Sequence, residues 1–272
     1  MSERETYPPG VPCWVDTLGP NPGRLTEFYG AIFGWDFAGP GTMPGDGSPG
    51  EYHVARLRGR DVAGIGSLPA GATPGPPGWN TYVRVESADR AAADARAAGG
   101  AVVAEPFDAP PAGRLAVLAD SEGAAFCAWE AGEREGAQLV NEPGAWSMSF
   151  LNSRDTEAAT SFYHELFSWS AEPFEFGELT AFLFRLPGFV GGEPRQPVPR
   201  DVVATMMPVG DGAEAHWGVD FWIGDTDAAA AVAEELGGGV IVAPHDNPAF
   251  RAAVLADPNG ARFGVNQLTA VP

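Results

Sequence analysis

The chain has 272 residues, of which 44% are hydrophobic, and a formal net charge of −20 at pH 7. This length leaves room for two ordinary hydrophobic cores. The negative charge argues against nucleic-acid and anionic-membrane binding, since both require a positively charged surface. All 16 basic residues are arginines, so Schiff-base chemistry on a lysine side chain is excluded.

The sequence has no run of about 18 consecutive apolar residues, so we expect no membrane span. The first residues, Met1 to Glu5, lack the basic and apolar regions of a signal peptide. The chain has two cysteines, Cys13 and Cys127, which are too few for a disulfide framework. We therefore expect a cytoplasmic protein.

A long internal repeat is the clearest pattern in the sequence. The landmarks Trp14, Phe28-Tyr29 and Trp35 return 134 residues later as Met148, Phe162-Tyr163 and Trp169. The segment from Asp120 to Gly123 returns as Asp257 to Gly260. A repeat of this length has the size of a small domain rather than of a solenoid unit. We predict a first domain over residues 8–131, a linker over 132–143 and a second domain over 144–272.

In the first domain, residue periodicity and turn signals predict ten elements. In chain order they are strand 12–18, helix 22–33, strands 35–38, 52–58, 62–68 and 80–86, helix 88–98, and strands 102–106, 113–119 and 125–130. The pair Gly99-Gly100 is expected to end the second helix in a left-handed cap. Residues 120–123 are expected to form a tight turn between the last two strands.

The second domain repeats these elements, with strand 146–152, helix 157–167, strand 219–223 and helix 225–236. Each domain divides into two halves with the order βαβββ, so this plan runs four times along the chain. The sequence therefore predicts an α+β fold of two tandem domains, each a pair of βαβββ modules.

Successive strand residues point to opposite faces of a sheet, which separates two faces in each domain. One face is apolar or β-branched and is expected to pack under the helices; it carries Val15, Thr17, Thr81, Val83, Val85, Phe126 and Ala128, matched by Leu151, Val219, Phe221, Ile223, Phe263 and Val265. The other face carries Trp14, Asp16, Asn80, Tyr82, Arg84, Cys127 and Trp129, matched by Met148, Phe150, Asn152, Gly218, Asp220, Trp222, Gly264 and Asn266.

Aromatic residues interspersed with a few polar groups are typical of a small-molecule cavity. The alternative for this second face is another hydrophobic core, in which Asp16 and Arg84 would form a structural ion pair.

The βαβββ plan, the string Phe28-Tyr29 followed by Phe33-Gly34-Trp35, and the turn from Asp120 to Gly123 resemble the vicinal oxygen chelate superfamily. This superfamily includes glyoxalase I, bleomycin-resistance proteins and extradiol dioxygenases. The resemblance covers nearly the whole chain and is closest to two-domain actinobacterial glyoxalase-like proteins. It implies a curved mixed sheet and a small-molecule pocket in each domain, but a shared fold does not imply a reaction.

Metal enzymes of the superfamily place His or Glu ligands at set points, and none of the matching positions here holds His, Asp or Glu. The first-strand, fifth-strand and last-strand positions are Trp14, Asn80 and Cys127, or Met148, Gly218 and Gly264 in the second domain. The remaining ligand maps near residues 64–66 and 204–206. Because a zinc or iron site needs three or four converging ligands, the resemblance implies no metal here, and we expect no cofactor.

The four histidines match no ligand spacing; they are His53, His164, His216 and His245. Only His216 lies on the face that mixes aromatic and polar residues. Cys127 is a candidate nucleophile, but no histidine partner is evident, and a buried small hydrophobe is the favoured reading.

The function favoured by the sequence is metal-free binding of a small, partly aromatic metabolite. The candidate ligand-binding residues are Trp14, Asp16, Asn80, Tyr82, Arg84, Cys127, Trp129, Met148, Phe150, Asn152, Trp222 and Asn266. The alternative is a metal-independent isomerase, lyase or hydroxylase of a secondary metabolite, with Asp16 or Asp220 as general base. A metal-dependent lyase of the glyoxalase I type is least favoured.

The two domains are not expected to be equivalent. The first domain combines Asp16, Asn80 and Arg84, whereas glycines occupy positions 218 and 264 of the second, so tighter binding is expected in the first. We also expect the domains to pair about a pseudo-two-fold axis, so that the protein is a monomer and its partner is a small-molecule ligand.

Overall fold

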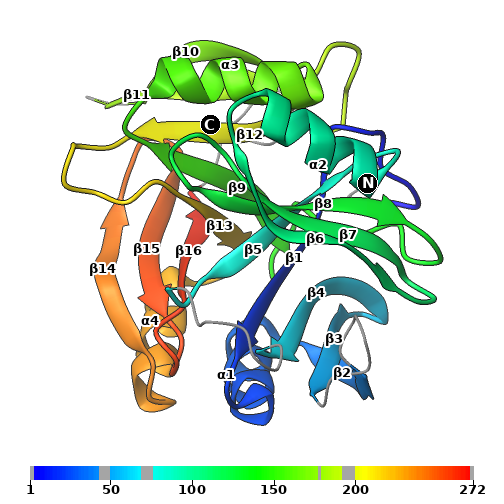
Figure 1. The fold of residues 1–272 in the computed structure, drawn as a ribbon. Helices are drawn as coiled ribbons and strands as arrows, with labels where there is room; N and C mark the ends of the chain where they lie inside the picture. The colour runs from blue at the N-terminus through cyan, green and yellow to red at the C-terminus, as the bar shows by residue number, and fades with distance from the viewer. Residues whose placement is uncertain (1–2, 43–49, 69–75, 177–178, 192–199, 270–272) are drawn as a thin grey trace.

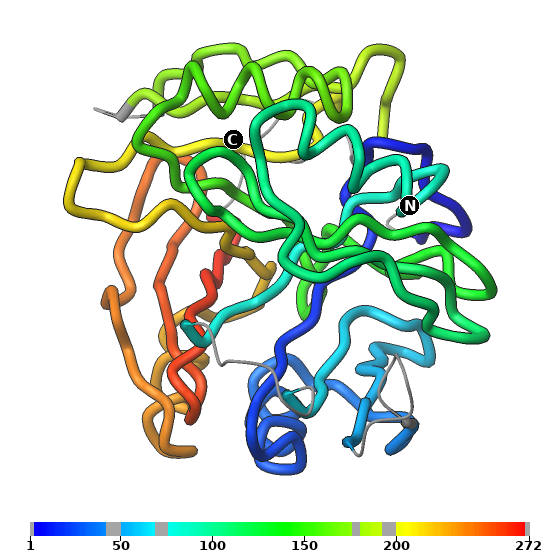
Figure 2. The backbone as a smooth tube through the Cα atoms, viewed as in Figure 1, coloured from blue at the N-terminus to red at the C-terminus, as the bar shows by residue number. Residues whose placement is uncertain are grey.

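Each half of the chain folds into its own eight-stranded sheet in the computed structural model, which describes residues 3–42, 50–68, 76–176, 179–191 and 200–269. The backbone passes once from the first sheet to the second (Figure 1, Figure 2). Among these residues, no helix is long and apolar enough to cross a membrane.

The first half of the chain contains eight of the strands and two helices. They are β1 (Pro12–Gly19), α1 (Pro22–Phe33), β2 (Asp36–Thr42), β3 (Glu51–Leu57), β4 (Arg60–Ser67), β5 (Trp79–Arg84), α2 (Ala88–Ala97), β6 (Ala101–Ala109), β7 (Gly113–Ala119) and β8 (Ala125–Ala131).

The second half repeats this order. Its elements are β9 (Trp146–Ser153), α3 (Thr156–Phe167), β10 (Ser170–Phe176), β11 (Leu179–Arg185), β12 (Val202–Pro208), β13 (His216–Trp222), α4 (Thr226–Glu235), β14 (Gly239–Asp246), β15 (Phe250–Ala256) and β16 (Arg262–Leu268).

The two sheets have the same strand order, β2-β3-β4-β1-β5-β8-β7-β6 and β10-β11-β12-β9-β13-β16-β15-β14. In each sheet the first strands of the two βαβββ modules lie side by side and antiparallel at the centre, β1 with β5 and β9 with β13. The last strand of each module runs parallel to the first strand of the same module. The predicted plan is confirmed, and the modules pair within each half of the chain.

Local sequence explains where the helices begin. The side chain of Asn21 accepts a hydrogen bond from a backbone N–H in the first turn of α1, and Pro22 occupies a first-turn position that needs no donor. The other three helices are capped in the same way, by Ser87, Asp155 and Asp225. Each cap satisfies a backbone donor that the helix itself leaves unpaired.

The face predicted to pack under the helices is buried in both sheets. In the first sheet Thr17, Val83 and Phe126 are buried, and in the second their counterparts Leu151, Phe221 and Phe263 are buried. The sheets also meet each other on this side, where Thr81 and Ser149 share a hydrogen bond of 2.7 Å between their hydroxyl oxygens.

Helices from the two domains lie side by side on this shared side, α1 with α4 and α2 with α3 (Figure 1). Tyr29 of α1 donates a hydrogen bond to Asp257 Oδ2 (3.0 Å), in the turn before β16. The same hydroxyl accepts a hydrogen bond from Trp79 Nε1 (3.0 Å). A helix of the first domain is thereby tied to a turn of the second.

The matched residues of the other copy make the reciprocal contact. Tyr163 of α3 donates to Asp120 Oδ2 (3.1 Å) in the turn before β8, and it accepts from Trp217 Nε1 (2.8 Å). The Phe-Tyr string and the Asp-to-Gly turn that mark the repeat in the sequence thus join the two domains to each other, in a pseudo-two-fold arrangement.

Aromatic rings surround both tyrosines. Tyr29 contacts Phe33 of its own helix and Trp79 of β5, and it also contacts Phe263 of the second domain, which packs against Phe221. Tyr163 likewise contacts Phe126 of the first domain. Each cluster therefore contains rings from both domains, so the two halves share one hydrophobic core.

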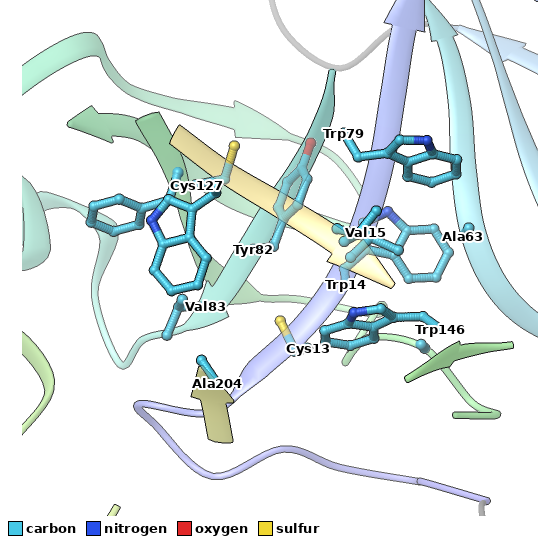
Figure 3. Packing of buried hydrophobic residues seen from close by; sticks show 14 of the residues in the cluster. Cys13, Trp14, Val15, Ala63, Trp79, Tyr82, Val83, Cys127, Trp146 and Ala204 are labelled. Carbon is cyan, nitrogen blue, oxygen red and sulfur yellow. The ribbon is translucent and has the colours of Figure 1, made fainter. Parts of the chain in front are cut away.

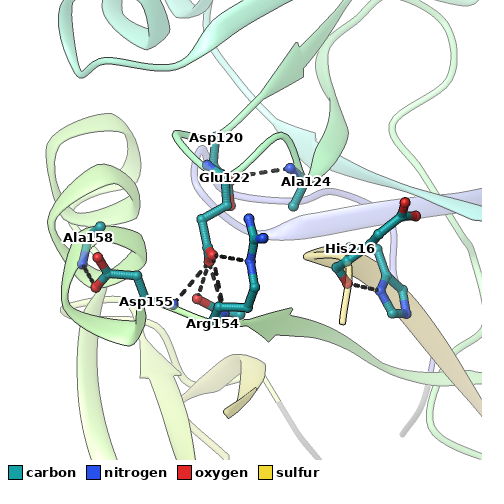
Figure 4. Close-up of polar contacts among 9 residues, drawn as sticks. Asp120, Glu122, Ala124, Arg154, Asp155, Ala158 and His216 are labelled. Atoms are coloured by element: carbon teal, nitrogen blue, oxygen red, sulfur yellow. Dashed lines mark hydrogen bonds and ion pairs between the residues drawn. The ribbon is translucent and has the colours of Figure 1, made fainter. Parts of the chain in front are cut away.

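Glu122, in the turn before β8, anchors the start of the second domain's first helix (Figure 4). Its carboxylate accepts hydrogen bonds from Ser153 Oγ (2.5 Å), from Arg154 Nε (3.0 Å) and from the backbone N–H groups of Arg154 and Asp155. Burial opposes ionisation, but these donors outweigh it and hold the pKa of Glu122 below its ordinary value.

The connection between the two sheets packs against the first domain. Ala137 donates its backbone N–H to the carbonyl oxygen of Cys13 (2.7 Å), and its own carbonyl accepts from the hydroxyl of Tyr7 (2.6 Å). Farther along, Leu139 forms an antiparallel bridge with Glu3. The connection is therefore held in place by backbone contacts.

Candidate functional site

Asp16 lies at the centre of the first sheet, on the face that points away from the helices. We call this the helix-free face of the sheet. Its neighbours in register are Gly64 of β4 and Asn80 of β5. Asp16 Oδ1 accepts a hydrogen bond from Asn80 Nδ2 (2.8 Å), and Oδ2 accepts from the hydroxyls of Tyr82 (2.6 Å) and Tyr52 (3.0 Å). Both oxygens of this carboxyl group are in use, and the side chain is 1% exposed.

This network decides what Asp16 can do chemically. Burial raises the pKa of Asp16, and the hydrogen bonds from Tyr82, Asn80 and Tyr52 offset part of that rise. Burial and the nearby carboxyl also hold the pKa of Tyr82 well above its ordinary value. Because Asp16 already has three donors and almost no exposed surface, it is poorly placed to remove a proton from a ligand.

Tyr52 belongs to this hydrogen-bond network but was not predicted from the sequence. Its hydroxyl occupies the space beside Gly64, where an added Cβ would lie 1.9 Å from the tyrosine oxygen. The same hydroxyl accepts a hydrogen bond from Trp14 Nε1 (3.0 Å). The glycine opposite Asp16 was a signal, but using it requires the strand register, which the sequence pattern alone does not define.

The connection between the two sheets covers one end of the helix-free face of the first sheet. The Arg134 guanidinium lies 5.1 Å from the ring centre of Trp14 and pairs with Asp61 through a contact of 2.9 Å. Trp129 Nε1 donates to the carbonyl oxygen of Arg134 (2.9 Å). Trp14 and Trp129 are both buried as a result.

The ion pair between Asp16 and Arg84, which the sequence left open, does not form. Arg84 lies 3.8 Å from a carboxylate oxygen of Glu135 instead. Cys127 is the register neighbour of Tyr82, on the side away from Trp14 (Figure 3). Burial raises the pKa of Cys127 well above its ordinary value, so its thiol is a poor nucleophile.

The helix-free face of the second sheet carries different groups at the matched positions. Phe150 replaces Asp16, and its ring lies across Gly218, where an added Cβ would be 2.4 Å from Phe150 Cζ. Asp220 leans over Gly264, where an added Cβ would be 1.8 Å from Asp220 Oδ1. The space beside these two glycines is therefore filled by the neighbouring side chains of Phe150 and Asp220.

Asp220 places a carboxyl group on this second face. It is partly exposed, and burial raises its pKa to about 7 against the opposing effect of a hydrogen bond with Asn266. Met148 is the register partner of Asp220 and is also partly exposed. Trp222, two residues after Asp220, is buried against the ring of Phe250.

His216 and Asn152 form a polar pair farther along the same face. Asn152 Nδ2 lies 3.1 Å from His216 Nε2. His216 Nδ1 lies 2.8 Å from the carbonyl oxygen of Glu214 (Figure 4). A neutral imidazole with its proton on Nδ1 satisfies both contacts. The other histidines form hydrogen bonds elsewhere. His53 bonds to Glu51, His164 to the carbonyl oxygen of Trp169, and His245 to the carbonyl oxygen of Ala243.

The donor groups of neither face fit the metal site that the superfamily implies. The ligand positions hold Trp14, Asn80 and Cys127, so Asp16 is the anionic group nearest to them and its oxygens already accept three hydrogen bonds. The second face offers Asp220 beside two glycines. Within the described ranges, no three His, Cys, Asp or Glu side chains are grouped closely enough to hold a metal ion.

Comparison with known proteins agrees with the repeat. The glyoxalase-like domain family matches the chain twice, at residues 14–129 and 148–266. The chain is 36% identical over 269 residues to CFP32 of Mycobacterium tuberculosis (strain CDC 1551 / Oshkosh), whose name suggests a glyoxylase, and the match covers 97% of both chains. It is 31% identical over 275 residues to the anthracycline biosynthesis protein DnrV of Streptomyces peucetius, covering 96% of this chain and 94% of that protein.

Solved structures share the fold at low sequence identity. The Mn(II)-bound glyoxalase from Novosphingobium aromaticivorans superposes with a TM-score of 0.61 at 14% identity, over 95% of this chain and 82% of that one. The 2,3-dioxygenase LapB from Pseudomonas sp. KL28 superposes with a TM-score of 0.59 at 12% identity, over 96% and 92%. With both of its halves matched, the chain belongs to the glyoxalase-like family of the vicinal oxygen chelate superfamily.

Proposed function

We propose that this protein binds a small, partly aromatic metabolite on the helix-free side of its curved sheets, and that it does so without a metal ion. The observation that carries the proposal is the replacement of the superfamily's metal ligands by Trp14, Asn80 and Cys127, and by Met148, Gly218 and Gly264. Aromatic rings supply contact area at such sites, and a few polar groups orient the ligand.

The names of the relatives support an aromatic ligand. Two of them, DnrV and DauV from Streptomyces, are named for anthracycline biosynthesis. Anthracyclines are built on planar, fused aromatic rings. A ligand of this kind would be matched by a sheet face that offers a flat aromatic ring such as that of Phe150 beside a carboxyl group such as that of Asp220.

A second candidate function is metal-independent catalysis, as an isomerase, lyase or hydroxylase of such a metabolite. The observation that favours it is Asp220, a partly exposed carboxyl whose pKa of about 7 suits a general base near neutral pH. Asp16 suits this role less, because three donors already occupy its oxygens. A metal-dependent lyase would need ligands that neither face provides.

Thermal unfolding after exhaustive treatment with a chelator tests the proposal. We expect planar aromatic compounds to raise the melting temperature of the metal-free protein, because a ligand at 100 times its dissociation constant stabilises by about 2.7 kcal/mol. Stabilisation that appears only after Mn²⁺, Fe²⁺ or Zn²⁺ is restored would contradict metal-free binding.

Recovery of the bound compound distinguishes binding from catalysis. If the protein only binds, chromatography with mass spectrometry returns the compound unchanged after long incubation. A new product or isomer that the wild type forms and Asp220→Asn does not form would establish the second candidate.

A further inference from the structure

The two helix-free faces differ in how much of each remains accessible. Trp14, Asp16, Tyr82 and Trp129 of the first domain are all buried, whereas their counterparts in the second domain are all partly exposed; these are Met148, Phe150, Asp220 and Asn266. Asp16 accepts hydrogen bonds from Asn80, Tyr82 and Tyr52, and Arg134 lies over the end of the first face. That face has little surface left for a ligand.

Phe150 gives the second face a flat aromatic surface. Three ring atoms at its far end would lie between 2.4 and 3.1 Å from a Cβ added at Gly218, its register partner on β13. The ring therefore lies down across the sheet instead of standing up from it. Because Phe150 is partly exposed, one side of this ring is available for stacking.

A cavity adjoins this surface at the start of β9. Its lining includes Trp146, Met148 and Phe189, and it is open to solvent. Trp146 is 6% exposed, and its indole nitrogen has no hydrogen-bond partner within the described part of the chain (Figure 3). A buried donor without a partner is costly, and an acceptor group on a ligand would relieve that cost.

We infer that the metabolite binds to the second domain, stacked on Phe150 between Asp220 and His216, and that it is a planar fused-ring aromatic compound with a hydroxyl group facing Asp220. This inference rests on the proposed function and assigns its site and ligand class. It is the opposite of the expectation from sequence, which rested on the glycines at positions 218 and 264.

The spacing of the polar groups sets the size of the ligand. His216 and Asp220 lie on the same side of β13, four residues apart, which corresponds to about 13 Å. Phe150 and Gly218 lie between them. A single aromatic ring is too short to reach both polar groups, whereas several fused rings span the distance and cover the phenylalanine.

A pair of soluble dyes tests the inference. Alizarin red S and anthraquinone sulfonate share a planar three-ring framework, and the first adds adjacent hydroxyl groups. We expect the wild type to bind alizarin red S at one molecule per chain, measured by isothermal titration and by the shift of its visible absorption. Phe150→Ala should weaken both dyes at least tenfold, and Asp220→Ala should weaken the hydroxylated dye at least tenfold while changing the other little.

Tyr52→Phe is the matched control, because it removes a hydroxyl from the first face and should leave both affinities unchanged. If Tyr52→Phe loses binding while Phe150→Ala and Asp220→Ala keep it, the site is in the first domain and the inference is wrong. If the wild type binds neither dye but other aromatics stabilise it thermally, the proposed function stands and this ligand class is overturned. If no aromatic compound binds, both are overturned.

Discussion

The carboxyl groups of Asp16 and Asp220 have different chemistry because of the residues beside them. Asp16 accepts hydrogen bonds from two tyrosines and an asparagine, whereas Asp220 has the amide of Asn266 and a glycine beside it. Burial raises the pKa of both, so each takes up a proton more readily in the folded chain than in the unfolded chain.

We expect Asp220→Asn to stabilise the protein at pH 8 and to have little effect near pH 4. The folded pKa of about 7 lies above the ordinary value of 3.8, so the cost of the ionised carboxyl is fully present above pH 7 and disappears as the pH falls toward 4. One pKa unit corresponds to about 1.4 kcal/mol. Because solvent screens this partly exposed group, we expect a gain of about 1–2 kcal/mol at pH 8.

Urea unfolding of the wild type and of Asp220→Asn at both pH values measures this difference. Asn266→Ala is a useful companion variant, since it removes the hydrogen bond that lowers the pKa of Asp220 and should increase the pH dependence. Equal stability changes at pH 8 and pH 4 would show that folding does not raise the pKa of Asp220.

The sequence predicted which face these side chains occupy, but it did not predict their contacts with the neighbouring glycines. Alternation along the strands assigned Asp16, Phe150 and Asp220 to the face away from the helices, and the structure places them there. The sequence did not show that the side chains of Tyr52, Phe150 and Asp220 fill the space beside Gly64, Gly218 and Gly264. Those contacts run between strands, and they depend on a register that residue patterns do not define.

At the scale of elements, the two tyrosine–aspartate contacts join a helix of one domain to a turn of the other. We expect Tyr29→Phe and Tyr163→Phe each to lower the free energy of unfolding by about 2–3 kcal/mol. Each change removes a donor from a buried carboxyl, Asp257 or Asp120, and also removes the acceptor of a buried tryptophan N–H.

Tyr7→Phe provides the comparison for this prediction. Tyr7 makes one hydrogen bond, to the carbonyl oxygen of Ala137, so its loss should cost about 1 kcal/mol. Denaturant titration of the three variants ranks them. If Tyr29→Phe and Tyr163→Phe cost no more than Tyr7→Phe, the reciprocal contacts between the domains contribute little to stability.

The ends of the two matched helices suggest a stabilising change. Gly34 directly follows α1 and Ser168 directly follows α3, and both residues adopt left-handed backbone conformations, with φ of 70° and 60°. A serine is less favourable there than a glycine because its Cβ is crowded. We expect Ser168→Gly to raise the free energy of unfolding by about 0.5–1 kcal/mol.

Gly34→Ser is the opposite substitution at the matched position. In the same denaturant assay it should lower the free energy of unfolding by a similar amount. Nothing lies within 4 Å of a Cβ added at Gly34, so backbone conformation rather than a clash would be responsible. Opposite signs to these would show that the two helix ends do not correspond.

Most of the elements could be predicted from sequence, and the contacts between them could not. The helix from Pro22 to Phe33 is observed with the predicted bounds, because it has a cap at one end and a glycine at the other. The recurring Phe-Tyr strings and Asp-to-Gly turns identified the fold, but the sequence did not show that each contacts its counterpart in the opposite domain.

At the scale of the whole molecule, the domains share aromatic clusters, so each would expose buried rings if separated. Phe263 of the second domain packs against Tyr29 of the first, and Phe126 of the first packs against Tyr163 of the second. We expect the intact protein to be a monomer, with a single-chain mass of 28.4 kDa by light scattering. Separately expressed halves should aggregate or dimerise.

Light scattering of the intact chain and of each half, over a range of concentrations, tests this expectation. A dimeric intact chain would contradict it. Two monomeric, cooperatively folded halves would also contradict it, because they would show that the shared clusters are not needed to bury either domain's helical face.

Native mass spectrometry of the protein purified from its own host, without chelator, tests whether the protein binds an aromatic ligand without a metal ion. We expect one organic ligand per chain, a planar aromatic compound, and no stoichiometric metal. Release of that ligand by Phe150→Ala but not by Tyr52→Phe would place it in the second domain. One Mn, Fe, Ni or Zn ion bound to either domain, and needed for the ligand to remain, would contradict metal-free binding.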